Sequence, residues 1–171
     1  MPKDKKKRRP RALPKACLCG SGKDYSACCK PLHAGARPAS DAVELMRSRF
    51  TAFCLGLPEY LWDTLHSQNE ASVQGKDAYC AKIARAPQTM QKCTLRVLDT
   101  REPDAHGVAQ VLFYADIAVH KRSRAFVEQA TFVQENGEWR YIAGHARAAS
   151  ELGHGLADLT IDHWDCGHHH H

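Results

Sequence analysis

The first half of the chain repeats its hydrophobic residues at the spacing of an α-helix. From residue 41 onward this period predicts a helix that Ser40 or Asp41 can cap and that ends before Gly56. Two shorter segments with the same period predict further helices, over 58–66 and 75–86. Residues 41–86 are therefore expected to be mainly helical.

From residue 90 the period of the pattern changes to two, which is typical of strands with one buried face. Four such segments predict strands over 92–100, 107–120, 124–135 and 138–145. The dipeptide Asn136-Gly137 between the last two is a strong hairpin signal. Helices followed by a run of antiparallel strands indicate the α+β class, with about three helices covering one face of the sheet.

The composition agrees with a small globular protein. The chain has 171 residues, of which 43% are hydrophobic, so one ordinary domain and a small appendage can be built around a packed core. No apolar run approaches the roughly 20 residues that a membrane-spanning helix needs. We therefore predict no membrane span.

The net charge of +5 comes from the N-terminus. Residues 1–15 contain eight of the 24 cations and one of the 19 anions, which leaves 16 cations and 18 anions, a net charge near −2, for the remainder. Such a basic arm is usually solvated and disordered, but it can also contact nucleic acid, the ribosome or an anionic membrane. No aromatic residue precedes Tyr25, so the arm offers no platform for base stacking.

The same N-terminus bears on location. Its charged start is not followed by the apolar stretch of a secretory signal, so we predict a cytoplasmic protein. Thiols stay reduced in that compartment, where clustered cysteines bind metal more often than they form disulfides.

The segment "ACLCGSGKDYSACCK", residues 16–30, is the richest in chemistry. Its Gly-Ser-Gly-Lys run is not a Walker phosphate loop, because Cys17 stands where the first glycine is required and Asp24 follows Lys23 in place of Ser or Thr. Two close cysteine pairs on either side of a turn can instead supply the four soft ligands of a closed, structural zinc site. Two disulfides or four unrelated thiols remain the alternatives.

The stretch "CLCGSGKDYSACC" resembles the SEC-C motif, a zinc-binding module found at the C-terminus of the preprotein translocase SecA and in other bacterial proteins. The resemblance implies Zn²⁺ as the cofactor and an aromatic side chain, Tyr25, packed beside the metal. Leu18 departs from the motif, which usually has proline there. The implied metal ligands are Cys17, Cys19, Cys28 and Cys29.

The body of the chain carries a second resemblance. The order of helices and strands resembles the cone-shaped fold of the nuclear-transport-factor-two superfamily. More narrowly, "ELMRSRFTAFCLGLPEYLWDTLH" and "ATFVQENGEWRYIAGH" resemble the bacterial YchJ family, which joins an N-terminal SEC-C motif to this cone. We therefore expect these parts of the chain: a basic arm 1–15, a zinc knob 16–32, a linker 33–39, the α+β cone 40–150, and a tail 151–171, to which tag residues can belong.

We also expect the cone to have a core of its own, and the knob to be too short to fold without metal. The expected cone is a curved antiparallel sheet packed against about three helices. The ending "CGHHHH" can chelate metal but is also what an expression tag leaves. Cys54, Cys80 and Cys93 lie in apolar patterns and are expected to act as small hydrophobes.

Cones of this type often hold a pocket between the helices and the sheet. An Asp–His pair in such a pocket could act as general base and acid. The sheet alternation, however, places Asp116 opposite the apolar face of its strand, and His66 falls at a predicted helix end. The weak candidates for a catalytic pocket are Tyr60, Asp63, His66, Tyr114, Asp116 and His145.

Two functions follow from the sequence. The first is a zinc-binding, non-enzymatic interaction protein whose knob and basic arm contact a protein partner, the ribosome or nucleic acid. The second is a small-molecule binder or a hydrolase- or isomerase-type enzyme that uses the cavity of the cone. Arg47 and Arg49 flank the buried stripe of the first helix, where they serve either structural ion pairs and solvation or an anion or interface contact.

Overall fold

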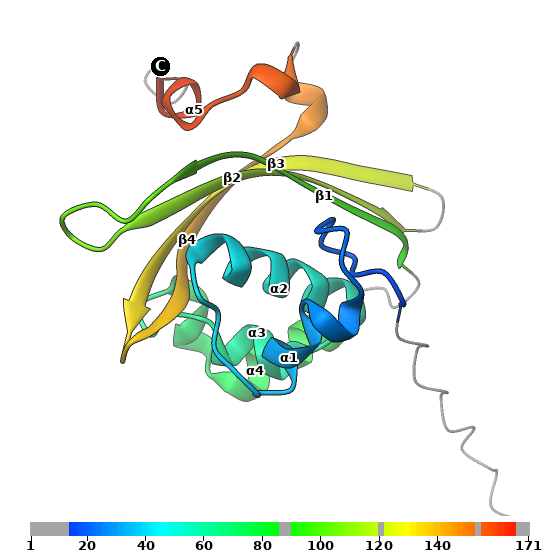
Figure 1. The fold of residues 1–171 in the computed structure, drawn as a ribbon, viewed down its shortest axis with the longest axis vertical. Helices are drawn as coiled ribbons and strands as arrows, with labels where there is room; N and C mark the ends of the chain where they lie inside the picture. Colours follow the sequence, from blue (N-terminus) through cyan, green and yellow to red (C-terminus); the bar gives the residue numbers. More distant parts are fainter. Residues whose placement is uncertain (1–13, 86–89, 120–121, 153–154, 167–171) are drawn as a thin grey trace, which may run out of the picture.

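Four strands form one antiparallel meander in the computed structural model, which describes residues 14–85, 90–119, 122–152 and 155–166 (Figure 1). The strands pair in the order β1-β2-β3-β4. Their bounds are β1 Met90–Arg101, β2 Ala109–Val119, β3 Arg122–Glu135 and β4 Glu138–Ala148. The predicted α+β class with a curved antiparallel sheet is confirmed. Most of the basic arm (residues 1–13) and the terminal histidines lie outside the described residues.

The main helices lie against the concave face of this sheet (Figure 1). They are α2 Ala42–Leu55, α3 Pro58–Asp63 and α4 Lys76–Ala84. Asp41 caps α2 by accepting a hydrogen bond from the Glu44 amide at 2.8 Å, and Gly56 ends the helix in the left-handed conformation with φ 70°. The start and end signals in the sequence thus set the bounds of α2.

Helix α3 is shorter than the predicted 58–66. Its next residues are drawn into a parallel bridge with β4: the Tyr141 amide donates to the Thr64 carbonyl, and the His66 amide donates to the Tyr141 carbonyl, both at 2.9 Å. In a longer helix the Thr64 carbonyl and the His66 amide would form bonds within the helix; here both are paired with β4 instead. A 3₁₀ segment, η2 Glu70–Gln74, then leads to α4.

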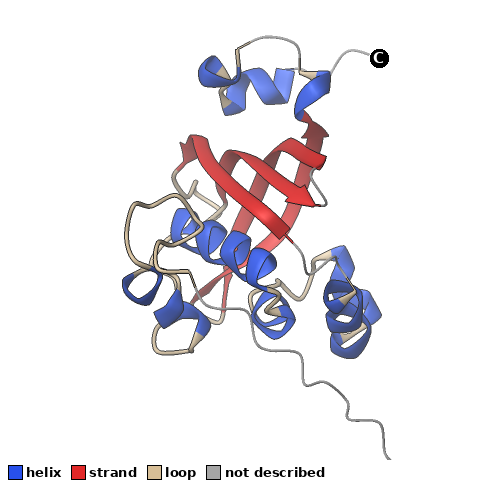
Figure 2. Cartoon of the chain, turned by 90° about the vertical axis from the view of Figure 1, so that its right-hand side faces the viewer, coloured by secondary structure: helices blue, strands red, loops and turns tan. Residues whose placement is uncertain are grey.

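The C-terminal segment covers the convex face of the sheet, opposite the main helices (Figure 2). It contains η3 Ala149–Glu151, η4 Leu156–Asp158 and α5 Ile161–Cys166. Ile161 and Trp164 of α5 are 0% and 3% exposed and pack with Leu112 and Val127 of the sheet. The sequence predicted no ordered element here, because two apolar residues in a six-residue helix are too few to show a period.

The N-terminal segment belongs to the main core. It consists of a loop, η1 Tyr25–Ala27 and α1 Lys30–His33. Cys17, Cys19 and Cys29 lie in the same hydrophobic cluster as Leu45 of α2 and Leu95 of β1. The core expected for the cone alone is therefore shared with the knob, whose apolar side chains belong to the same cluster.

Candidate metal centre

The knob is a tight loop that brings its two cysteine pairs together. The Cys17 amide donates to the Lys23 carbonyl at 2.9 Å, and the Tyr25 amide donates to the Lys15 carbonyl at 2.8 Å. Gly20, at the turn, has φ 75° and lies so close to β1 that a Cβ atom would be 2.8 Å from the Leu95 carbonyl oxygen. Glycine at this position thus allows both the turn and the docking of the loop.

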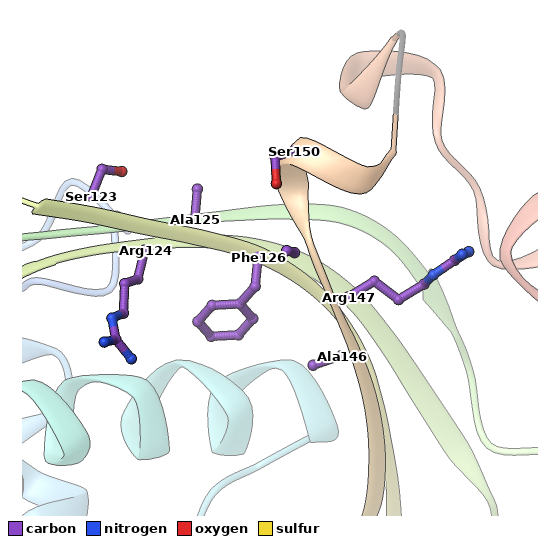
Figure 3. Close-up of a pocket in the computed structure, with 8 residues that line it drawn as sticks. Ser123, Arg124, Ala125, Phe126, Ala146, Arg147 and Ser150 are labelled. Carbon is purple, nitrogen blue, oxygen red and sulfur yellow. The ribbon is translucent and has the colours of Figure 1, made fainter.

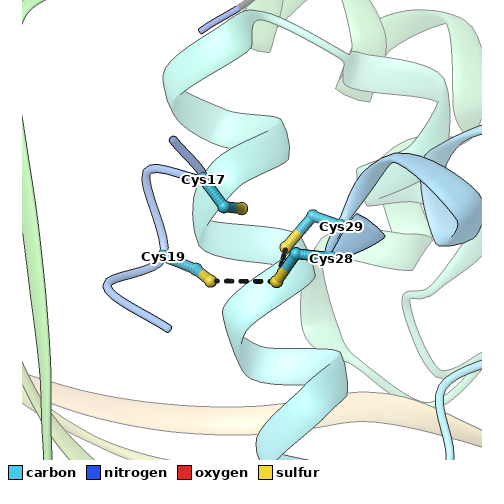
Figure 4. Close-up of side chains that lie close together, drawn as sticks. All are labelled: Cys17, Cys19, Cys28 and Cys29. Carbon is cyan, nitrogen blue, oxygen red and sulfur yellow. Dashed lines mark hydrogen bonds between the residues drawn. The ribbon is translucent and has the colours of Figure 1, made fainter. Parts of the chain in front are cut away.

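The four cysteine sulfurs converge on one point (Figure 4). All four Sγ atoms of Cys17, Cys19, Cys28 and Cys29 lie within 4.8 Å of one another. The Sγ of Cys28 is 3.5 Å from that of Cys19 and 4.0 Å from that of Cys29. Four sulfurs at about 2.3 Å from a tetrahedral zinc ion would be about 3.8 Å apart. The sulfurs are too far apart for disulfides, which need about 2.05 Å, and they fit a tetrahedral metal.

The environment of the thiols also suits a metal. Cys17, Cys19 and Cys29 are buried, while Cys28 is partly exposed and lies 3.1 Å from the Ser21 hydroxyl. Hydrogen bonds with the Cys17 and Cys19 sulfurs, together with burial, raise the pKa of the Cys29 thiol. Four thiolates cannot ionise together in so small a volume unless a cation compensates their charge. A four-cysteine cluster of this kind suggests metal binding.

Helix α2 anchors the knob through polar contacts. Arg47 donates from Nη1 to the Cys19 carbonyl, and the Thr51 hydroxyl lies 3.8 Å from the Cys17 sulfur. Arg49, on the same helix, donates to the Leu61 carbonyl at 2.7 Å and to the Thr64 hydroxyl at 2.6 Å. Both arginines therefore make structural hydrogen bonds, one to the knob and one to α3.

A chain of hydrogen bonds behind the cysteines links the knob to α2 and α3. His33 Nε2 donates to the Ser48 carbonyl at 2.8 Å, so His33 Nδ1 accepts from the Tyr25 hydroxyl at 2.7 Å. The Ser48 hydroxyl donates to the Leu45 carbonyl at 2.8 Å and accepts from the Tyr60 hydroxyl at 2.6 Å. Burial lowers the pKa of His33, which keeps the ring neutral in this chain.

The six residues that the sequence suggested for a pocket do not meet at one site. The Tyr60 hydroxyl belongs to the series of hydrogen bonds described in the preceding paragraph. Asp63 is exposed, and His66 Nδ1 accepts from the Gln68 amide at 3.0 Å while its Nε2 lies 3.6 Å from a Glu135 oxygen. Tyr60, Asp63 and His66 therefore lie in separate surroundings.

The three sheet candidates lie apart as well. Asp116 accepts a hydrogen bond from the Ser123 hydroxyl at 2.6 Å, and Tyr114 packs in the convex-face cluster. Asp116 is opposite Ala125 of β3, whereas His145 is opposite Gln129, four residues further along that strand. Four residues of strand span about 13 Å, so Asp116 and His145 do not form a pair.

Comparisons with known proteins identify the family. A family profile described as "YchJ, middle NTF2-like domain" matches residues 41–144, from the cap of α2 into β4. The chain belongs to the YchJ family. The matched part is the cone alone; the knob with its four cysteines precedes it.

Solved structures extend the likeness to the knob. The chain is similar to the solution structure of a SEC-C motif containing protein from Rhodopseudomonas palustris, with 29% identity, a TM-score of 0.61, and coverage of 77% of this chain and 98% of that one. It shares its fold with a SEC-C motif containing protein from Psychrobacter arcticus, whose crystal structure matches with 20% identity, a TM-score of 0.56, and coverage of 94% and 97%.

The concave face of this YchJ-family cone holds a polar cluster that the sequence did not reveal. The Tyr141 hydroxyl lies 3.5 Å from a Glu128 carboxylate oxygen, and the Arg49 guanidinium lies 4.8 Å from the centre of the Tyr141 ring. Burial raises the pKa of Glu128 to about 7. Gly144 makes room for the cluster, because a Cβ there would be 2.1 Å from the Tyr141 hydroxyl and 3.0 Å from the Glu128 carboxyl carbon.

The raised pKa of Glu128 predicts how stability depends on pH. The folded-state pKa of about 7 exceeds the ordinary value of 4.5, so the folded protein holds the proton more tightly, and stability is lost as the pH rises through this window. We expect Glu128→Gln to remove this loss and to raise the free energy of unfolding above pH 7 by about 2–3 kcal/mol. Urea unfolding of the parent and variant proteins at pH 5 and pH 8 measures this change in the free energy of unfolding.

The exposed Glu70 supplies the control for this experiment. Glu70→Gln should leave the pH dependence of unfolding as in the parent protein. If the parent and Glu128→Gln proteins lose stability equally between pH 5 and pH 8, Glu128 does not titrate in this range and the assignment is wrong.

No helix among the described residues is long and apolar enough to cross a membrane.

Proposed function

We propose that this YchJ-family protein binds one structural zinc ion through Cys17, Cys19, Cys28 and Cys29, and that its knob and basic arm contact an anionic macromolecular partner. The observation that supports the zinc site is the convergence of the four sulfurs within 4.8 Å. Zinc bound there would join the two cysteine pairs into one cross-link. All four ligands come from the chain, so the site is closed and has no position for a reacting water.

Surface charge on the knob supports the partner contact. Lys15, Lys23 and Lys30 are exposed around the buried cysteines. The basic arm joins the knob at Lys15, so its cations and those of the knob form one continuous positive segment. We propose the ribosome or another RNA in the cytoplasm as the partner, because a dense row of cations binds a phosphate backbone through counterion release.

The division of the chain is part of the proposal. The arm 1–15 and the knob 16–32 serve the contact, the linker 33–39 leads to the cone 40–150, and the tail 151–171 follows it. The cone then acts as the scaffold on which the knob is mounted.

A second candidate function is a small-molecule binder or an enzyme that uses the concave face. The contact between Glu128 and Tyr141 favours it, because a partly buried carboxyl with a pKa of about 7 suits general acid or base work at neutral pH.

Zinc stoichiometry tests the first proposal. Elemental analysis of the full chain without its terminal histidines should find about one zinc per chain. The double variant Cys28→Ser, Cys29→Ser should lose it, since two of four ligands cannot hold the ion. Cys80→Ser, which changes a cysteine of α4 outside the cluster, is the matched control and should keep the metal.

Cobalt provides a readout that does not depend on the folding of a variant. Replacing zinc by Co²⁺ in the parent protein should give the thiolate-to-metal charge-transfer absorption and the visible bands of a tetrahedral sulfur site. Full metal content in the double variant, or octahedral cobalt spectra in the parent protein, would contradict the proposed ligands.

A further inference from the structure

The sheet has an open notch where β3 runs on past the end of β4. The last residue of β4, Ala148, is opposite Phe126, so residues 122–125 of β3 pair with β2 on one side and with no strand on the other. The chain after Ala148 leaves the strand pairing and forms η3, which packs against β3 and borders the notch with Ser150. A depression of about 600 Å³ opens in this notch (Figure 3).

The lining of this sheet-end pocket is apolar and cationic. Its eight residues are two arginines, two serines, three alanines and one phenylalanine, and no acidic residue is among them. Figure 3 shows Arg124, Phe126 and Ala146 on the side of the sheet that faces α2. Ala148 shares that face because it is directly opposite Phe126. These side chains form an apolar shelf with a guanidinium at its outer end.

The cation on this shelf is available for a ligand. The Arg124 side chain is exposed and forms no hydrogen bond or ion pair with any residue that the structure describes. The second arginine, Arg147, lies with its guanidinium 6.0 Å from the centre of the Trp164 ring, on the convex side. The carboxylate of Asp116 accepts a hydrogen bond from Ser123, which Figure 3 shows on the face opposite Arg124.

The shelf is shallow at β4 and closed at its inner end. Ala146 and Ala148 are exposed, and their methyl groups leave room above the strand. Glu128, the next residue of β3 on this face after Phe126, is opposite Ala146 and marks the inner end. A larger side chain at Ala146 would therefore fill the space that the alanine leaves.

We propose that the sheet-end pocket binds a small aromatic carboxylate, whose carboxylate pairs with Arg124 and whose ring lies on Phe126 and Ala146. The depression, which is lined from both faces of the sheet end, has a volume of about 600 Å³, within the range of sites for small molecules, which are mostly apolar with a few placed polar groups. The planar guanidinium of arginine fits a carboxylate with two parallel hydrogen bonds. The ring of Phe126 supplies the stacking surface for an aromatic body.

This proposal does not rest on the zinc site, because none of the four cysteines lines the pocket.

An NMR titration of the full chain with naphthalene-2-carboxylate tests the proposal. We expect amide shifts concentrated at residues 123–126 and 146–148, with a Kd on the order of 1 mM or tighter for a ligand of this size. The neutral analogue naphthalene-2-carboxamide should bind at least tenfold more weakly, because it cannot form the ion pair with Arg124.

Three variants locate the site. Arg124→Gln should weaken the binding of the carboxylate at least tenfold while leaving the affinity for the carboxamide unchanged. Ala146→Leu should weaken both ligands by filling the shelf. Arg96→Gln removes an exposed arginine from β1, at the opposite edge of the sheet, and should change neither affinity.

The amide spectrum of each variant shows directly whether it is folded. Equal affinities for the acid and the amide, an Arg124→Gln protein that binds like the parent, or shifts concentrated away from the notch would each overturn the proposal.

Discussion

Removing the metal from the four-cysteine site is expected to unfold the whole protein or to lower its stability by several kcal/mol, and not merely to release the knob. Structural zinc contributes about 10–16 kcal/mol to folding in zinc-finger peptides, which is comparable to the entire stability of an ordinary domain. Only part of that figure applies to a fold with a large core, so we expect a loss on the order of 4 kcal/mol.

The loss should spread to the sheet because the knob and the cone share one core. Tyr25, at 4% exposure, and three of the four cysteines lie in the cluster that α2 and β1 also build. The hydrogen bonds from Tyr25 to His33 and from His33 to the Ser48 carbonyl tie the same segment to α2. If the knob melts, this face of α2 becomes exposed and the cone loses part of its core.

Circular dichroism in the far ultraviolet, followed against temperature, measures the melting temperature of the secondary structure. The chelated protein and the variant Cys28→Ser, Cys29→Ser should both melt well below the zinc-loaded parent. Cys80→Ser in α4 is the control and should melt with the parent. Unchanged melting of the sheet after complete removal of zinc would show that the cone folds without the knob.

The sequence predicted best where local chemistry decides the structure. Asp41 and Gly56 bound α2 because a side-chain cap and a left-handed residue act within one turn of helix. The strands followed from alternation, and Asn136, with φ 53°, sits in the predicted hairpin turn. The four cysteines could be grouped from the sequence for the same reason, since their close spacing along the chain is a local signal, and their sulfurs do lie within 4.8 Å of one another.

The concave-face cluster was not predictable, because it depends on the register of distant strands. Pairing shifts by one residue between Thr131 and Phe132, opposite the stretch from Tyr141 to Ala143. In a regular strand Tyr141 and Gly144 would face opposite sides, but the extra residue turns both toward Glu128. A bulge of this kind leaves no mark in the hydrophobic pattern, so Glu128 appeared as an ordinary polar residue between apolar ones.

Deleting residues 1–15 is expected to remove most of the affinity of the protein for RNA. The deleted segment holds eight cations, whereas the remainder has a net charge near −2 and should not attract phosphate by itself. If the arm neutralises about six phosphates of a single strand, the logarithm of the affinity falls with the logarithm of salt concentration with a slope of about −4. A rise from 50 to 200 mM salt would then weaken binding on the order of 10²-fold.

Fluorescence anisotropy with a labelled mixed-sequence RNA measures both effects, using the full chain and a chain that starts at Ala16. A triple variant, Lys5→Gln, Lys6→Gln, Lys7→Gln, should lower the salt slope in proportion to the cations lost. An RNA of shuffled sequence should bind the full chain equally well, because contacts between cations and phosphates carry no sequence information.

Equal affinity of the full and shortened chains would contradict the role of the arm and move the contact to the body. Arg47 and Arg49 would not be the first residues to change in that case, because both donate hydrogen bonds within the fold. Lys23 and Lys30 are exposed on the knob and would be replaced first. Their loss would then reduce RNA binding without the loss of stability that replacing either arginine should cause.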